Sequence, residues 1–231
     1  METATMSAIA HIRSDFPEKF GIPRQSGLVE ELTAKIIFEP EYRQMSAFRG
    51  LEGFSHLWLI WEFSKARGKP WSPTVRPPRL GGNARLGVFA TRSPFRPNPI
   101  GLSCVRLVRL EQDPKLGPVL VVAGADLMDA TPIYDIKPYL PYADCKPEAV
   151  GGFASQPKEP SLQVEIPEHL LALVPEEKRQ ALRGVLAQDP RPQYQKDPQR
   201  VYGMAFGELE VRFQVEGENL KVVEILLRKS S

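Results

Sequence analysis

Short runs of apolar and β-branched residues alternate with Pro, Gly, Asn and Asp along the first two thirds of the chain. Runs of this kind, bounded by turn-forming residues, are typical of β-strands. The pattern predicts strands at residues 7–13, 34–38, 54–63, 86–90, 101–110 and 119–126. Few helical periods separate them and no Gly-x-Gly-x-x-Gly follows a strand, so a βαβ dinucleotide-binding fold is disfavoured. A closed or nearly closed antiparallel barrel is the economical arrangement.

The pattern changes after residue 150. Small residues and prolines at 151–160 indicate a linker, and residues 167–174 and 176–186 then repeat apolar side chains at helical spacing. Residues 209–215 and 220–227 alternate like two strands joined by a tight turn. The sequence therefore predicts a mainly β protein, with an antiparallel β-barrel domain at residues 1–150 and a small α+β domain at residues 161–231.

Charge is segregated within the first part of the chain. Residues 64–110 hold ten Lys and Arg and no Asp or Glu, which leaves 20 basic and 28 acidic residues elsewhere. Pro94, Pro97 and Pro99 fix φ and bias the residues before them toward extended conformations. Arg92 and Arg96 therefore project from a stiff loop with little freedom to lose on binding. A basic face kept only for solubility would not need that stiffness, so we expect a phosphate-bearing partner.

Composition limits the chemistry. Cys104 and Cys145 are too few for a disulfide framework, the N-terminus lacks the features of a signal peptide, and no apolar run is long enough to span a bilayer. A cytoplasmic protein is expected. His11, His56 and His169 lie far apart in the sequence without cysteines at zinc-ligand spacing, so no metal site is expected. His56 is interpreted as a hydrogen-bonded strand residue rather than a catalytic base, and Cys104 as a small apolar residue.

Five long motifs follow one another in the sequence, at residues 20–25, 50–58, 76–85, 90–101 and 129–142. Together they resemble the TrmO (TsaA, YaeB) family of S-adenosylmethionine-dependent tRNA methyltransferases. The resemblance covers essentially the whole chain, because residues 186–194 also look like the bacterial members. It implies a β-barrel enzyme, usually a homodimer, that methylates N6 of N6-threonylcarbamoyladenosine at position 37 in the anticodon loop of tRNA.

The resemblance also implies where S-adenosylmethionine binds. The implied contacts are Pro23, Arg24, Gln25, Ser64, Lys65, Arg92, Leu102, Asp129, Ala130, Thr131 and Pro132. Ser64 and Lys65 replace the His-Gln of the family pattern, which leaves backbone contacts there. Arg24 and Arg92 suit the carboxylate of the cofactor, and Asp129 suits its amine or ribose. Alternatively, the two arginines bind only RNA phosphate and Asp129 caps the turn before Thr131.

Methyl transfer to N6 requires an in-line approach to the methyl carbon and loss of the proton on N6. Within residues 134–137, Asp135 is the candidate base, Lys137 the candidate stabiliser of charge on the carbamoyl oxygen, and Tyr134 a further candidate catalytic residue. Equally, Asp135 and Lys137 could form a structural ion pair on one face of a strand.

The threonyl carboxylate of the substrate matches an arginine fork better than a lysine. The candidate arginines are Arg76, Arg79, Arg85 and Arg96. Each could instead hold the anticodon-loop backbone, which would govern affinity and salt dependence rather than turnover. Phe95, Tyr139 and Tyr142 could stack on unpaired bases or pack locally. Two other functions stay open, a non-catalytic RNA-binding barrel and a methyltransferase for a small anionic metabolite.

Overall fold

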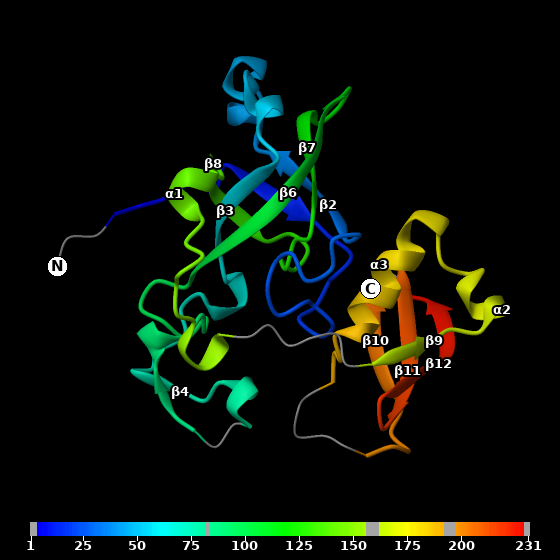
Figure 1. The fold of residues 1–231 in the computed structure, drawn as a ribbon. Coiled ribbons are helices and arrows are strands. Elements are labelled where there is room, and N and C mark those ends of the chain that lie inside the picture. The colour runs from blue at the N-terminus through cyan, green and yellow to red at the C-terminus, as the bar shows by residue number, and fades with distance from the viewer. Residues whose placement is uncertain (1–3, 82–83, 156–161, 192–196, 229–231) are drawn as a thin grey trace.

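The computed structural model of the 231-residue chain describes residues 4–81, 84–155, 162–191 and 197–228 (Figure 1). The first part of the chain is built on six strands: β1 (Ala10–Arg13), β2 (Thr33–Phe38), β3 (His56–Glu62), β6 (Ile100–Asp113), β7 (Gly117–Ala123) and β8 (Pro132–Pro138). They are hydrogen-bonded in the order β1-β2-β7-β6-β3-β8, and β1 also pairs with β8, so the strands close into a barrel. All six pairings are antiparallel. The mainly β character predicted from the sequence is confirmed.

The interior of the barrel is filled by alternate residues of its strands. In β3, Leu57, Leu59 and Trp61 are buried, whereas the residues between them are partly exposed. Ile36 and Leu120 enter the same core from neighbouring strands. Each such side chain contributes about 1.5–3 kcal/mol through the area it removes from water, which is why the two-residue periodicity specifies the strand register.

A bulge in β8 re-aims one side chain of this barrel. Ile60 pairs with Asp135 and the next residue, Trp61, pairs with Ile133, so Tyr134 has no partner in the register of β3. Bulges bend a strand and turn the extra residue out of the regular alternation. The Tyr134 side chain thereby reaches the end of β3, where the candidate site begins.

The rest of the chain forms a second sheet with strand order β10-β11-β12-β9. Its strands are β9 (Gln163–Glu165), β10 (Tyr202–Phe206), β11 (Leu209–Glu216) and β12 (Asn219–Leu227), with β9 parallel to β12. The helix α3 (Arg179–Ala187) packs on this sheet, and α2 (Glu168–Leu171) lies beside it (Figure 1). Apolar side chains of α3 join Met204 and Phe213 of the sheet in one core.

A segment of the first part of the chain belongs to this second core. Phe16, Val29 and Leu32 are each at most 3% exposed and lie in the same apolar cluster as α3 and the second sheet. The carbonyl of Asp15 accepts a hydrogen bond from the Gly207 amide at 2.7 Å, and the Asp15 carboxylate pairs with Lys178. The two sheets are therefore joined by packing and not only by the chain that connects them.

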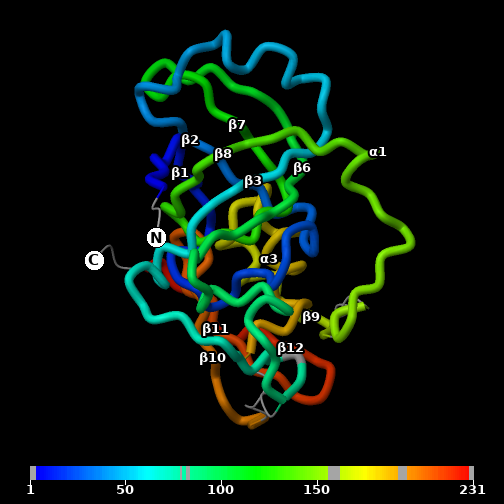
Figure 2. The backbone as a smooth tube through the Cα atoms, turned by 90° about the vertical axis from the view of Figure 1, so that its left-hand side faces the viewer, coloured from blue at the N-terminus to red at the C-terminus, as the bar shows by residue number. Residues whose placement is uncertain are grey.

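Short elements complete the molecule. They are η1 (Pro40–Tyr42), η2 (Met45–Phe48), η3 (Leu51–Gly53), η4 (Ser64–Ala66), β4 (Thr74–Val75), η5 (Pro78–Leu80), β5 (Leu86–Gly87), η6 (Val88–Ala90), α1 (Pro141–Asp144), η7 (Gly152–Ala154) and η8 (Glu176–Lys178). From α1 the chain runs along the outside of the barrel toward the second sheet (Figure 2). No helix within the described ranges is long and apolar enough to cross a membrane.

Most of the predicted elements are present. Strands predicted at 7–13, 34–38, 54–63, 101–110, 119–126, 209–215 and 220–227 correspond to β1, β2, β3, β6, β7, β11 and β12, and the helical stretches contain α2, η8 and α3. The strand predicted at 86–90 is wrong beyond Gly87. There the amide and hydroxyl of Thr91 both donate to the Val88 carbonyl and turn the chain into η6. Residues 156–160 of the predicted linker lie outside the described residues.

Candidate functional site

A cavity of about 510 Å³ opens at the end of the barrel where β3 ends and β6 begins. Its walls come from four stretches of chain, within residues 19–25, 61–65, 91–102 and 126–131. Strand pairing explains the convergence, because Glu62 at the end of β3 lies opposite Ile100 at the start of β6. The fold thus assembles one site from segments that are far apart in the sequence.

A chain of hydrogen bonds fixes one wall of this cavity. Trp61 Nε1 donates to Ser103 Oγ at 2.9 Å, and that hydroxyl donates to Asp126 Oδ1 at 2.5 Å. The Trp61 indole lies directly on Gly101, where a Cβ atom would overlap the ring. Only glycine allows this approach of the indole to the β6 backbone. The wall is therefore both apolar, through the ring, and polar, through the carboxylate.

Asp126 is the most unusual carboxylate of the site. It lies just beyond β7 and lines the cavity. Burial raises its pKa above the ordinary value, although the hydrogen bond from Ser103 and the charge of Arg92 act in the opposite direction. A carboxylate held in such a wall is matched by a ligand that brings a positive charge.

Glu62 forms a second buried polar group at the cavity. The residue is 6% exposed, and Arg67 donates to both its oxygens, with Nε to Oε1 at 2.9 Å. The Tyr134 hydroxyl donates to Oε2 at 2.8 Å. The hydrogen bond from Arg67 lowers the pKa of Glu62. The pKa of Tyr134 is raised, mainly by burial and secondly by the hydrogen bond to Glu62. Glu62 and Arg67 flank η4, and Tyr134 is bonded to Glu62. We call Glu62, Arg67 and Tyr134 the η4 clamp.

A braced arginine loop forms the opposite wall. Arg92 Nη1 donates to Gln25 Oε1 at 2.5 Å, which joins residues 91–102 to the loop at 23–25. Arg96 Nη1 donates to the Thr91 carbonyl at 3.0 Å, and the Ser93 amide donates to the Thr91 hydroxyl. These bonds add to the stiffness that the prolines impose, so the two guanidinium groups are held in place before any ligand arrives.

The structure brings together eight of the eleven residues implied as cofactor contacts. Those lining the cavity are Pro23, Arg24, Gln25, Ser64, Lys65, Arg92, Leu102 and Thr131. Asp129, Ala130 and Pro132 are not among the described lining residues. The Asp129 carboxylate instead accepts a hydrogen bond from the Ser14 amide at 3.0 Å, which ties this turn to the end of β1, and Ala130 next to it has a positive φ of 58°.

The three candidate catalytic residues lie on β8, outside the cavity lining. Lys137 Nζ lies 2.9 Å from Asp135 Oδ2, and both side chains are about half exposed. This geometry is that of the structural ion pair considered as the alternative. Tyr134 reaches the site through its bond to Glu62.

The candidate RNA-binding arginines divide into two groups. Arg96 lines the cavity, whereas Arg76 and Arg85 are exposed beside β4 and β5, with Arg85 Nη1 at 3.4 Å from the Thr74 hydroxyl. The side chain of Arg79 lies outside what the structure describes. Of the aromatic candidates, Tyr139 packs against the rings of His56 and Trp58.

The residues interpreted as inert fit that interpretation. His56 Nδ1 is hydrogen-bonded to the Ser55 hydroxyl at 2.9 Å at the start of β3. Cys104 is partly buried on β6, and burial raises the pKa of its thiol, which makes the reactive thiolate rarer. In the described parts of the chain no group of three His, Cys, Asp or Glu side chains is placed to hold a metal ion.

Sequence reasoning missed Trp61, Glu62 and Asp126. Two of them carried a signal in the sequence. Glu62 is an acidic residue that interrupts an apolar strand, and Asp126 is an acidic residue that ends an apolar strand. Their partners depend on the strand register and on the bulge at Tyr134, which no local pattern specifies.

The fold and the site together define a closed β-barrel with a cavity of mixed polarity behind a stiff, strongly basic rim. Residues 11–145 match the family model described as the tRNA-methyltransferase O N-terminal domain, and residues 159–228 match the TrmO C-terminal domain. The chain belongs to the TrmO family.

Similar proteins match over most of their length. A tRNA (adenine(37)-N6)-methyltransferase of Escherichia coli (strain K12) is 43% identical over 233 residues, which cover 96% of this chain and 97% of that protein. One from Eikenella corrodens is 48% identical over 174 residues, covering 75% and 97%. The crystal structure of TrmO from Pseudomonas aeruginosa superimposes with a TM-score of 0.78 at 35% identity, over 97% of this chain and 100% of that one.

Proposed function

We propose that the protein is a tRNA (adenine(37)-N6)-methyltransferase that transfers a methyl group from S-adenosylmethionine to N6 of adenosine 37. Family membership supports the reaction. One structural observation carries the proposal to this chain: eight of the residues implied as cofactor contacts come from distant segments and line one cavity. We also propose the division into a barrel domain at residues 1–150 and an α+β domain at residues 161–231, joined by a linker.

The cavity fits S-adenosylmethionine, which carries a carboxylate, an ammonium group, a sulfonium centre and an adenine ring. Arg24 and Arg92 offer the forked donors that suit a carboxylate. Asp126 offers negative charge for a cation, and Trp61 and Leu102 offer apolar walls. A volume of about 510 Å³ lies within the range of small-molecule sites.

The residues of the chain act mainly by positioning. When bound, S-adenosylmethionine supplies an electrophilic methyl carbon on its sulfonium centre. The η4 clamp would hold the backbone of Ser64 and Lys65 against the bound cofactor, and the Trp61 ring would exclude water from that side of the cavity. Two carboxylates qualify to accept the proton from N6: Asp126, which lines the cavity with a raised pKa, and Asp135, which pairs with Lys137 on β8.

The finer features are also proposals. The substrate adenosine carries the threonylcarbamoyl group, whose carboxylate is matched by Arg96 at the cavity. The enzyme works in the cytoplasm, on the anticodon loop of tRNA. It acts as a homodimer, as the resemblance to the TrmO family implies.

Calorimetric titration with S-adenosylmethionine tests the cavity assignment. Arg92→Met removes a charge-assisted contact, which we expect to raise the Kd about 10- to 100-fold. Arg109→Met serves as the matched control, because Arg109 is half exposed on β6, pairs with Glu111 and does not line the cavity. Equal affinities for all three proteins would contradict the assignment. Wild-type protein that retains tRNA without binding the cofactor would favour the non-catalytic RNA-binding alternative.

A further inference from the structure

Three aromatic side chains of the basic segment are exposed to an unusual degree. Phe89 is 76% exposed, Trp71 50% and Phe95 45%. Exposed rings of this size forgo burial that would stabilise the fold, and together they mark an interaction surface rather than a core. None of the three takes part in the cavity or in the packing of either sheet core.

Backbone hydrogen bonds join the segments that carry these three rings. The Ser72 amide, next to Trp71, donates to the Phe95 carbonyl at 3.1 Å. The Val88 amide, next to Phe89, donates to the Pro73 carbonyl at 3.0 Å. Pairing of β4 with β5 holds the same region together. We call Trp71, Phe89 and Phe95 the aromatic lobe.

The aromatic lobe is rigid and continuous with the cavity. The Phe95 amide donates to the Ser93 hydroxyl, and the Ser72 hydroxyl donates to the Thr74 carbonyl at 2.6 Å. Pro94 and Arg96, on either side of Phe95, both line the cavity. The aromatic lobe therefore adjoins the rim of the cavity at Phe95.

Charge decides what this surface binds. No Asp or Glu occurs between residues 64 and 110, and the exposed Arg76 and Arg85 directly adjoin β4 and β5. A protein partner with an ordinary mixed surface would gain little here, whereas a polyanion with flat aromatic faces matches both the arginines and the rings. Paired bases in a duplex do not expose those faces, but unpaired bases in a loop do.

We propose that the aromatic lobe binds single-stranded RNA by stacking unpaired bases on Trp71, Phe89 and Phe95, while the neighbouring arginines contact phosphates. This inference rests on the proposed function, because the bound strand is taken to be the RNA loop that is presented to the cavity. Stacking holds the loop open, which leaves one base free to enter the cavity.

Fluorescence anisotropy with a labelled, unmodified anticodon stem-loop RNA tests the proposal, with a blunt duplex of the same composition as a second probe. Trp71→Ala, Phe89→Ala and Phe95→Ala should each raise the Kd for the stem-loop by about 5- to 150-fold and change duplex binding much less. Phe89→Tyr should retain the affinity and Phe89→Leu should lose it, because leucine is apolar but has no ring to stack.

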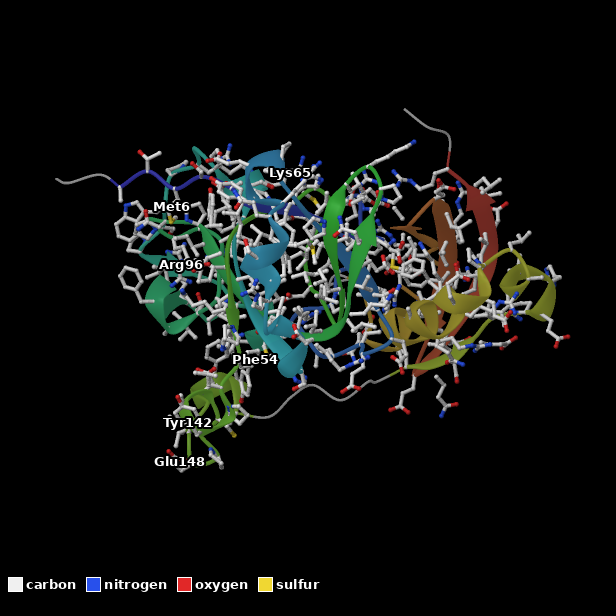
Figure 3. All side chains as sticks on the ribbon, turned by 90° about the horizontal axis from the view of Figure 1, so that it is seen from above. Met6, Phe54, Lys65, Arg96, Tyr142 and Glu148 are labelled. Carbon is white, nitrogen blue, oxygen red and sulfur yellow. The ribbon has the colours of Figure 1, made fainter. Side chains whose placement is uncertain are left out.

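Phe54→Ala is the matched control. Phe54 is an aromatic residue that is 36% exposed, and Figure 3 shows it well away from Arg96. Its replacement should leave the Kd within about twofold of wild type. An equal loss in this variant would overturn the assignment to the aromatic lobe.

Several results would overturn the proposal: unchanged Kd in all three alanine variants, full affinity in Phe89→Leu, or equal losses with stem-loop and duplex. Sedimentation of the variants as smaller species than wild type would overturn it too, by showing that a second copy of the chain covers the rings. The same variants titrated with S-adenosylmethionine keep the two proposals apart. If RNA binding depends on the rings but no methyl group is transferred, the aromatic lobe is supported and the proposed function is contradicted. If a methyl group is transferred but RNA binding does not depend on the rings, the proposed function is supported and the aromatic lobe is contradicted.

Discussion

Single residues at the cavity are arranged for binding at a cost in stability. Asp126 is the clearest case, because burial raises its pKa by more than the hydrogen bond from Ser103 and the charge of Arg92 lower it. The folded protein therefore holds this proton more tightly than the unfolded chain does. The neutral Asp126 carboxyl group makes its full contribution to the free energy of unfolding below the ordinary pKa of 3.8. That contribution is lost as the pH rises through the raised pKa of Asp126 in the folded protein.

Asp126→Asn should accordingly raise Tm at pH 7, since the amide keeps an acceptor for Ser103 and removes the buried charge. The same variant should weaken S-adenosylmethionine binding, because a partner for positive charge is lost. Thermal unfolding and calorimetry measure the two effects. Asp113→Asn is a control of opposite sign, because backbone hydrogen bonds from Leu116 and Lys115 lower the pKa of Asp113. A lower Tm in Asp126→Asn would show that the carboxylate stabilises the fold.

Gly101→Ala tests the close contact between the β6 backbone and Trp61. The added methyl group overlaps the indole, so the ring must move and its bond to Ser103 is lost. We expect a loss of about 1–3 kcal/mol in the free energy of unfolding and a higher KM for S-adenosylmethionine. Gly87→Ala provides the comparison, since a Cβ there would meet no atom of the described residues within 4 Å. Equal stability of the two variants would rule out the proposed packing.

At the scale of elements, the η4 clamp links the end of β3 to the bulge in β8. Because Arg67 lowers the pKa of Glu62, the charged clamp contributes stability above the ordinary pKa of 4.5, and that contribution is lost as the pH falls through the folded value. The clamp also fixes η4, whose residues Ser64 and Lys65 line the cavity.

Glu62→Gln should lower Tm at neutral pH, raise the KM for S-adenosylmethionine and leave kcat nearly unchanged, because the turn moves while the reacting groups stay. The difference in Tm from wild type should shrink as the pH falls below 4.5. Melting curves across pH and steady-state kinetics supply both readouts. Glu111→Gln is the surface comparison, since its bonds to Arg109 and Lys35 are solvent-screened. A loss confined to kcat would instead place Glu62 among the reacting groups.

Elements with a clean alternation were predictable from the sequence, and those with mixed signals were not. β3 and β7 show long apolar runs, whereas β8 carries Pro132, Asp135 and Lys137 within seven residues and reads as a loop. Eight of the eleven residues implied by the motifs of the family line the cavity. The roles of Asp126 and Glu62 could not be predicted, because they arise from the strand register and from the bulge at Tyr134.

At the scale of the whole molecule, the segment between β1 and β2 is built into the core of the second sheet. Residues 16–32 lie early in the chain, yet Phe16, Val29 and Leu32 are buried among residues of α3 and the second sheet. The loop at 19–25, which forms one wall of the cavity, is carried by this shared segment. The second sheet therefore supports the site without lining it.

Phe16→Ala should lower the free energy of unfolding by about 3–5 kcal/mol, because Phe16 is fully buried. Unfolding should remain a single transition when followed by both circular dichroism and tryptophan fluorescence, since all three tryptophans lie in the first part of the chain. Leu227→Ala, at a residue that is 78% exposed, should change little. Two separate transitions, with only one of them shifted, would show that the sheets unfold independently.

The most direct test of the central claim is mass spectrometry of nucleosides from tRNA incubated with the protein and S-adenosylmethionine bearing a deuterated methyl group. Two tRNA preparations are compared, one with and one without threonylcarbamoyladenosine at position 37. The proposed function predicts the heavy methyl group on N6 of that nucleoside in the modified tRNA, with turnover lost in Arg92→Met. Label at any other nucleoside, or no label while both cofactor and tRNA are bound, would contradict it.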